Sequence, residues 1–347
     1  MQLDAAVQDG LQFLQSRQMP SGQFPVEMTT ISNGVTRVEP DDALFSTAHI
    51  IYSIGQIPDP VAIGITNLGL DYFQNEMTGH GLWRHWNKDS VRAGRRLAPF
   101  IPADLDDMCC ISYLLRRHGR QYPDNKRLVA LNRNRAGLFY TWMMLRPTPT
   151  LNLTYWLSMI SEFNLQRFTI FWKVTEAGYL DVDGVVNANV MLYLGETRTT
   201  RSAAAWLKEI VETGREAECD KWYRDVYTFH YAVSRIVADG SHALDDIREL
   251  AVNRLTSVAS ENGRLGDNIL HSALAIISLL NWGVSGAIID RAIANLIESQ
   301  EQNGSWPSEI YYYGGPKKVA HWGSSELTTG ICMEALYRYR LSIRGGA

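Results

Sequence analysis

Cysteine is scarce in this chain. Four cysteines occur in 347 residues, and of these only Cys109 and Cys110 are close to one another in the sequence. No Cys-x-x-Cys pair is present, so we do not expect a disulfide framework. Thiols that stay reduced are typical of the cytosol, which is therefore the compartment that we expect.

An excess of positive charge is also missing. Lys and Arg number 33 against 37 Asp and Glu, and the formal net charge is -4. Without a basic surface, nucleic acid is not an expected partner. No apolar run reaches the roughly 18–20 residues that span a bilayer, and the N-terminal residues lack the basic start and apolar core of a signal peptide.

Linkers rich in Pro, Gly or Ser are absent as well. Hydrophobic residues make up 46% of the chain, which is enough for a sizeable core. No composition shift marks a domain boundary, so we expect residues 1–347 to form a single domain.

What the sequence does contain is a recurring pattern of an apolar helical stretch, a Gln, and then Gly-x-aromatic. The clearest example runs from Gln300 through Gly304 to Trp306, and a second one ends at Gly81 and Trp83. A glycine at this point fits the end of a helix, because it adopts a left-handed backbone without a Cβ penalty. Such self-similarity is typical of helical repeat folds.

Two kinds of helix alternate along these repeats. One kind is apolar nearly all round, as buried helices are, and is expected at 42–55, 106–119, 183–195, 224–240, 267–283 and 324–339. The other kind is amphipathic and should face solvent, and it is expected at 4–18, 60–74, 125–135, 199–214, 244–258 and 285–300.

Six buried helices alternating with six amphipathic ones predict an all-α fold, a closed (α/α)6 barrel made of six helical hairpins. An open helical solenoid remains the alternative. Strand signals are sparse, and the best one is the short tyrosine run at 311–313. The stretch 147–172 is the least regular and is not assigned.

Three carboxylates stand at the head of one predicted buried helix. Asp104, Asp106 and Asp107 directly precede the apolar run 111–115. Aspartates favour the first turn of a helix, where backbone N–H groups and the helix dipole stabilise them. Three anions this close repel one another, so in a buried site one of them should keep its proton near neutral pH. The cluster is therefore either a charged helix cap or a group that acts as a strong acid.

Taken together, these two motifs resemble a known family. The element from Gln300 to Trp306 is similar to the glutamine–tryptophan repeats of squalene–hopene and oxidosqualene cyclases, and 104–107 matches the DxDD motif of class II terpene cyclases. The resemblance implies that Asp106 protonates a terminal alkene or epoxide of a linear polyprenyl substrate. It assigns a supporting role to Asp104 and Asp107, which would orient the proton and stabilise the remaining anion.

The same resemblance implies that aromatic faces stabilise the carbocation that follows. The candidates for contact with substrate are Trp83, Trp86, Trp142, Asn187, Tyr311, Tyr312, His321 and Trp322. Among these, Asn187 and its neighbour Asn189 place amides on a buried helix, where they could bond to backbone or position substrate. His321 could orient the acid or act as the terminating base.

Protonation of an alkene needs no cofactor and no metal. Mg²⁺ would accompany the substrate only if that substrate is a diphosphate. The cations that could hold a diphosphate are Arg92, Arg95, Arg96, Lys317 and Lys318, although solvated surface charge is their ordinary interpretation.

The chain departs from the family in two ways. Met108 follows DxDD where family members commonly carry Thr, and the chain has room for one barrel where the family pairs two. A second subunit or a homodimer could supply the missing half. Contact with a membrane surface, from which a lipid-like substrate would be collected, is also left open.

Three alternatives use the same barrel. A zinc-dependent prenyltransferase would use Asp107 and Cys109 with His271 or His321. A carbohydrate-active enzyme would use paired carboxylates, and Asp41, Asp42, Asp183 and Asp267 also head inner helices. A toroid that only binds a partner is the non-enzymatic alternative.

Overall fold

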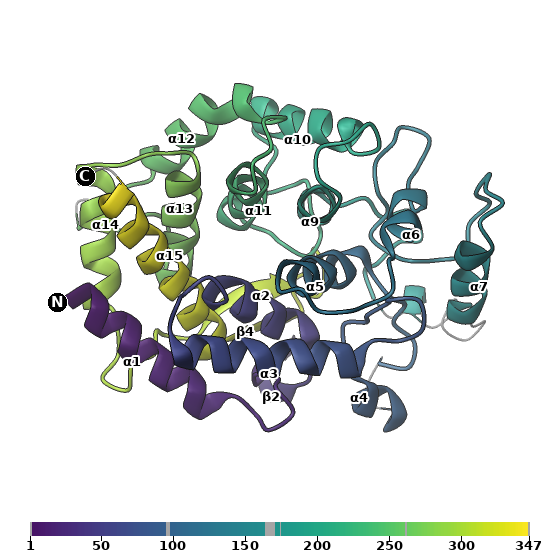
Figure 1. Cartoon of the computed structure of the whole chain (residues 1–347), viewed down its shortest axis with the longest axis horizontal. Helices are drawn as coiled ribbons and strands as arrows, with labels where there is room; N and C mark the ends of the chain where they lie inside the picture. The colour runs from purple at the N-terminus through teal and green to yellow at the C-terminus, as the bar shows by residue number, and fades with distance from the viewer. Residues whose placement is uncertain (1, 95–97, 164–170, 174, 261, 346–347) are drawn as a thin grey trace.

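Apolar helices that are buried on nearly every side form the centre of the molecule (Figure 1). The computed structural model describes residues 2–94, 98–163, 171–173, 175–260 and 262–345. The inner helices are α2 (Leu44–Ile54), α5 (Leu105–Arg117), α9 (Gly184–Leu194), α11 (Val226–Ala238), α13 (Ile269–Asn281) and α15 (Ser325–Gly345). Each packs against the next in this order, and α15 packs back against α2, so the contacts close into a cycle.

A second set of helices covers the inner ones from outside. These are α1 (Gln2–Arg17), α3 (Pro60–Glu76), α6 (Lys126–Leu131), α10 (Arg201–Thr213), α12 (Arg248–Ser257) and α14 (Ala287–Glu298), with a 3-10 turn η1 at Asp245–Ile247. They bury one face and expose the other, as their amphipathic sequences predict. The two ends of the chain meet where α1 packs against α15 (Figure 1).

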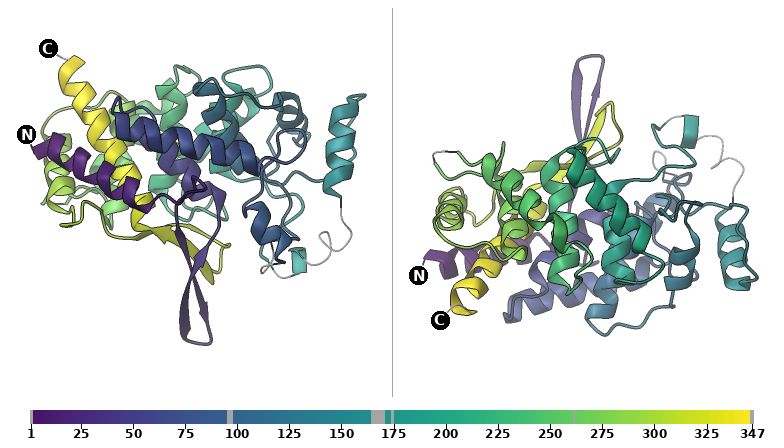
Figure 2. Two further views of the ribbon diagram at one scale, coloured as in Figure 1. Left: turned by 60° about the horizontal axis from the view of Figure 1, so that its bottom comes forward. Right: turned by 90° about the horizontal axis from the view of Figure 1, so that it is seen from above.

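Two further helices lie at the edge of the molecule. They are α4 (Lys88–Arg92) and α7 (Leu153–Glu162), and α7 stands apart from the helical body (Figure 2). Part of the unassigned stretch 147–172 is thus helical, while residues 164–170 of it lie outside the described residues. No described helix combines the length and apolarity that crossing a membrane requires.

A small antiparallel sheet makes the all-α expectation incomplete. Its strands are β1 (Val26–Ser32), β2 (Val35–Asp41), β3 (Glu309–Tyr313) and β4 (Ala320–Ser324), in the order β2-β1-β4-β3. The strand expected at 311–313 is confirmed, because these residues lie in β3. The sheet lies at one end of the helical body, from which the β1–β2 hairpin projects (Figure 2).

The β1–β2 hairpin has a sequence signal that periodicity did not reveal. Asn33 and Gly34 form its two-residue turn, and their φ angles are 50° and 75°. Positive φ at both positions is the type I′ geometry, whose twist matches paired strands. The exposed strand β2 carries no apolar face to mark it, so the Asn-Gly dipeptide was the informative signal.

The glutamine–tryptophan elements act as helix caps. Trp83 Nε1 donates a hydrogen bond to the carbonyl of Phe73 near the end of α3 (2.8 Å), and Trp306 Nε1 donates to Leu296 near the end of α14 (2.7 Å). The last carbonyls of a helix have no partner within it, and Leu296 is among these in α14, so the Trp306 indole satisfies a group that would otherwise be buried and unpaired. The Phe73 carbonyl also accepts from the N–H of Met77 (3.1 Å), so the Trp83 indole is its second donor. Each element therefore ties an outer helix to the turn that follows it.

We expect Trp83→Phe and Trp306→Phe to destabilise the protein by similar amounts. Each replacement removes one buried hydrogen bond and leaves a small cavity, at a cost of about 2–3 kcal/mol. Urea unfolding measures this loss, and Trp206→Phe on the outer helix α10 is the control at a half-buried tryptophan. A cost no larger than that of the control would contradict the capping role.

Candidate active site

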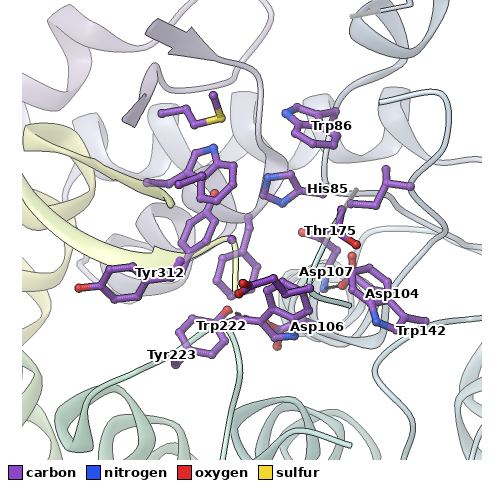
Figure 3. A pocket seen from close by; sticks show the side chains of 18 of the residues that line it. His85, Trp86, Asp104, Asp106, Asp107, Trp142, Thr175, Trp222, Tyr223 and Tyr312 are labelled. Atoms are coloured by element: carbon purple, nitrogen blue, oxygen red, sulfur yellow. Dashed lines mark hydrogen bonds between the residues drawn. The ribbon is translucent and has the colours of Figure 1, made fainter. Parts of the chain in front are cut away.

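A cavity of about 350 Å³ lies where the sheet meets the inner helices (Figure 3). Nearly half of its lining residues are Phe, Tyr or Trp, and its acidic lining residues among the described part of the chain are Asp104, Asp106, Asp107 and Glu176. Two sides are formed by elements far apart in sequence, the start of α5 and the sheet strands β3 and β4. The fold therefore brings the acid cluster to an apolar chamber.

Asp106 is nearly buried, with 9% of its surface exposed. Its Oδ2 accepts a hydrogen bond from the Tyr223 hydroxyl (2.5 Å), and its Oδ1 accepts one from Asn189 Nδ2. Burial raises the pKa of Asp106, while these two hydrogen bonds and the charge of Arg235 lower it. Because burial is the largest of these effects, the carboxyl holds its proton more firmly than an ordinary Asp.

Arg235 is a buried cation whose charge acts on Asp106. It is 1% exposed, and its guanidinium lies over the rings of Tyr52 (4.8 Å) and Tyr231 (4.7 Å). It also donates a hydrogen bond to Asn189 Oδ1. Since Asn189 has its oxygen held by Arg235, its NH₂ group must point at Asp106. The arginine thus orients the amide that supports the carboxylate.

Asp104 and Asp107 form a second, coupled pair. Asp104 caps α5 by accepting a hydrogen bond from the backbone N–H of Asp107 (2.9 Å). Burial raises the pKa of Asp104 to about 7, and burial together with the neighbouring Asp104 raises the pKa of Asp107 well above its ordinary value. Asp107 Oδ1 is buried and has no hydrogen-bond partner among the described residues. This pair is therefore protonated in part at neutral pH.

The raised pKa values predict that stability falls as the pH rises. The folded protein keeps the Asp104 proton up to about pH 7, whereas the unfolded chain releases it near the ordinary value of about 4. Between these values the folded state binds more protons, so the free energy of unfolding decreases with pH, by about 1.4 kcal/mol per unit for one group. Urea unfolding from pH 5 to pH 8 measures the slope. Asp104→Asn should flatten it, and an equal slope in this variant would contradict the assignment.

Four of the expected substrate-contacting aromatics line the cavity. They are Trp86, Trp142, Tyr312 and Trp322. Tyr312 and Trp322 face each other across β3 and β4, with parallel rings 5.1 Å apart. Trp86 and Trp322 both donate their indole N–H to the buried carboxylate of Asp41. The strand pairing and this shared acceptor hold the rings in place.

Four other expected residues lie outside the cavity lining. Trp83 caps α3, as described above. Asn187 bonds to the backbone of Phe139 through both its oxygen (2.9 Å) and its nitrogen (3.1 Å), so both ends of its amide are occupied by protein. Tyr311 lies in the core beside His49, whose Nδ1 is 3.2 Å from its hydroxyl.

His321 is the fourth of these residues. It lies on β4 between two residues that line the cavity, Ala320 and Trp322. Successive side chains of a strand point to opposite faces, so His321 faces away from the acid. Its ring contacts Tyr313 at 6.1 Å between centroids.

Sequence reasoning missed several residues of the site. Tyr223, which bonds to Asp106, lies in the loop before α11, and Arg235 lies within that apolar helix, where a buried cation is uncommon. An arginine in the middle of an apolar helix was the available signal, because a buried charge requires a partner. The other unforeseen lining residues include Phe45, His85, Phe171 and Trp222.

The expected diphosphate-binding cations are dispersed. Arg92 is exposed and pairs with Asp89 (3.3 Å). Lys317 pairs with Glu176 (3.3 Å), and Lys318 lies over the Tyr313 ring (4.9 Å). Arg95 and Arg96 lie outside the described residues.

The alternative chemistries find little support in this geometry. Within the described residues, no group of three or more His, Cys, Asp or Glu side chains is placed to hold a metal ion. Cys109 is fully buried, and burial raises the pKa of its thiol. Nor do the other helix-heading acids line the cavity among the described residues; these are Asp41, Asp42, Asp183 and Asp267.

Comparison with solved structures shows where this architecture occurs. The type II terpene cyclase MstE from Scytonema superposes with a TM-score of 0.70 at 15% identity, over 98% of this chain and 99% of that one. The chain has the fold of a type II terpene cyclase. A variant of MstE in complex with geranylgeranyl dihydroxybenzoate, its substrate, matches with a TM-score of 0.69 at 15% identity, over 98% of each chain.

A longer terpene cyclase also shares this type II terpene cyclase fold. ent-Copalyl diphosphate synthase from Streptomyces platensis matches with a TM-score of 0.56 at 15% identity, over 88% of this chain but 50% of that one. This chain thus corresponds to the whole of MstE and to about half of the synthase. No family model and no curated protein matches the sequence.

Proposed function

We propose that this protein is a class II terpene cyclase, which folds as one (α/α)6 barrel and cyclises a linear polyprenyl substrate by protonation. The observation that carries the proposal is the position of Asp106. It is a buried carboxyl whose pKa is raised by burial, and it lines a cavity with aromatic walls. An acid that must protonate an alkene needs a largely apolar, water-poor setting.

The initiating step follows from the hydrogen bonds of this acid. Asp106 transfers its proton to a terminal alkene or epoxide of the substrate and becomes a carboxylate. Tyr223 and Asn189 donate to its two oxygens, and the nearby charge of Arg235 stabilises the anion further. Interactions that favour the anion make Asp106 a stronger acid, because they stabilise what remains after proton transfer.

Asp104 and Asp107 support this step from the adjacent wall. Because their pKa values are raised, Asp104 and Asp107 carry less negative charge at neutral pH. Fewer neighbouring anions make it easier for Asp106 to release its proton. Asp104 also fixes the first turn of α5 through its cap. These two residues therefore tune the acid without donating the proton.

The aromatic walls of the cavity would stabilise the positive charge that develops after protonation. Trp86, Trp142, Trp222, Tyr312 and Trp322 present aromatic rings to the cavity. The face of such a ring attracts a cation most strongly where water is excluded. Ring closure then proceeds along the polyene within a cavity whose shape selects the product.

The substrate class is suggested by MstE, whose variant binds a geranylgeranyl compound. We propose a polyprenyl chain for this cavity as well. Because MstE and this chain cover one another almost completely, a single domain is sufficient in our proposal, and no second subunit is required to complete the fold.

Incubation with a panel of polyprenyl substrates tests the proposal. The panel contains squalene, polyprenols, polyprenyl diphosphates with and without Mg²⁺, and prenylated dihydroxybenzoates. We expect cyclised products of at least one member by gas or liquid chromatography with mass detection. In deuterated water the product should gain one deuterium, which marks protonation as the first step. Consumption without deuterium gain would contradict the mechanism.

A further inference from the structure

His85 places a nitrogen base within the wall of the cavity. Its ring lines the chamber, and Figure 3 shows it together with Trp86 on the side away from Asp106 and Tyr223. The Nε2 atom is buried and has no hydrogen-bond partner among the described residues. A buried polar atom without a partner is uncommon in proteins and calls for an explanation, which a ligand or a reacting group can supply.

The backbone around His85 is hydrogen-bonded to the start of α2. Its carbonyl accepts a hydrogen bond from the N–H of Leu44 at the start of α2 (2.9 Å). The next residue, Trp86, pairs with Ala43 as an isolated bridge. The backbone position of His85 is therefore tied to the first turn of an inner helix, which places the residue beside the cavity.

Three aromatic rings surround the imidazole. Their centroids lie 4.8 Å (Trp86), 5.8 Å (Tyr312) and 5.4 Å (Trp322) from that of His85, and all three contacts are edge-to-face. The two indoles donate to the same carboxylate, Asp41, which lies at the N–H edge of both rings. A cation near these rings is favoured both by the aromatic faces and by the nearby carboxylate.

We propose that His85 is the base that ends the carbocation cascade, and that the Trp86, Tyr312 and Trp322 rings hold the last cation beside it. This inference rests on the proposed function and deepens it. It replaces His321, which faces away from the cavity, as the terminating residue.

Loss of a proton converts the last cation into a neutral alkene. A C–H bond on the carbon next to the cationic centre breaks, and its electron pair forms the new C=C bond. The proton goes to the Nε2 lone pair, in the tautomer whose proton is on Nδ1, and later leaves to solvent. One proton enters from Asp106 and one leaves through His85, so the overall reaction is an isomerisation.

The electrostatics of the imidazole are consistent with this role. Burial lowers the pKa of His85 to about 4, against the opposing charge of Asp41, so the ring is neutral at neutral pH. A neutral ring has a free lone pair and does not repel an approaching cation. A carbon-bound proton next to a carbocation is acidic enough for a weak base to remove it.

The test compares the products of wild type, His85→Phe and His85→Gln on a substrate that wild type cyclises. We expect folded His85→Phe to consume substrate within about threefold of the wild-type rate, because initiation is at Asp106. The fraction of the main wild-type product should fall about tenfold, replaced by alkene isomers or alcohols formed by capture of water. His321→Phe is the matched control and should leave the product ratio unchanged.

A substrate deuterated at the position that loses the proton supplies an independent readout. In wild type, the label should shift the product ratio toward by-products, because breaking the C–D bond at His85 is slower. In His85→Phe this dependence of the product ratio on the label should differ or vanish.

Melting temperatures establish which variants are folded. If His85→Phe is not folded, His85→Gln tests the role of His85 by the same measurements.

Two outcomes would overturn the assignment. One is an unchanged product ratio in a folded variant that still turns over. The other is complete loss of substrate consumption in a folded variant, since His85 would then act before the cation forms. Failure of the wild type to cyclise any substrate would instead count against the proposed function. That outcome differs from both of the outcomes that overturn the role of His85.

Discussion

Asp106→Asn is expected to lower the rate of cyclisation by at least about 10³-fold, because general-acid catalysis typically contributes 10²–10⁴-fold and our proposal assigns the initiating proton to Asp106. The amide can still bond to Tyr223 and Asn189, so the fold should persist. It cannot supply a proton of comparable acidity. The measurement is product formation under single-turnover conditions with the best substrate of the panel.

Asp59→Asn is the matched control for this experiment. Asp59 also heads a helix, α3, where it accepts a hydrogen bond from the N–H of Val61 (2.8 Å), but it lies on the outer layer. The same change of carboxylate to amide at this cap should leave the rate unaltered. Retained cyclisation in a folded Asp106→Asn variant would refute the assignment of the proton donor.

Arg235→Met is expected to cost about 3–5 kcal/mol of stability, as breaking a buried charged network commonly does. The change removes the guanidinium that lies between the rings of Tyr52 and Tyr231, and it leaves the oxygen of Asn189 without its donor. Urea unfolding measures this loss. A cost below about 1 kcal/mol would show that the network contributes little to the fold.

The same variant should also be a weaker catalyst when folded. Arg235 lowers the pKa of Asp106, so its removal raises that pKa and weakens the acid. Activity at a temperature where the variant is folded should fall, and Arg235→Lys should recover part of it because the charge is retained. An Arg235→Met variant that is unstable but fully active would contradict the electrostatic role and leave only the structural one.

The helical layout could be read from the sequence because its signals are local. Helix periodicity, helix-ending glycines and acidic caps all act within a few residues, and each of the six expected buried stretches overlaps an inner helix of the structure. Four of them contain the whole helix, whereas α5 begins one residue before its expected stretch and α15 ends six residues beyond its own. The sheet was missed for the opposite reason. β1 pairs with β4 across nearly 300 positions of sequence, and no local pattern reports such a partner.

The acid motif shows the same division within one site. Asp104, Asp106 and Asp107 were recognisable from their spacing, and the structure places all three at the cavity. Tyr223, Asn189 and Arg235 come from other elements and meet Asp106 only through folding. Their roles depend on distances that spacing in sequence does not encode.

By itself, then, the sequence determined the repeat, the alternation of buried and exposed helices, and the DxDD cluster at the head of α5, since each follows from short-range physical chemistry. Only the tertiary structure decided which aromatics face the cavity. Tyr311 and Tyr312 are neighbours in sequence, yet only Tyr312 lines the chamber. His85 rather than His321 borders it, because strand alternation turns one ring away while the start of α2 holds the other in place.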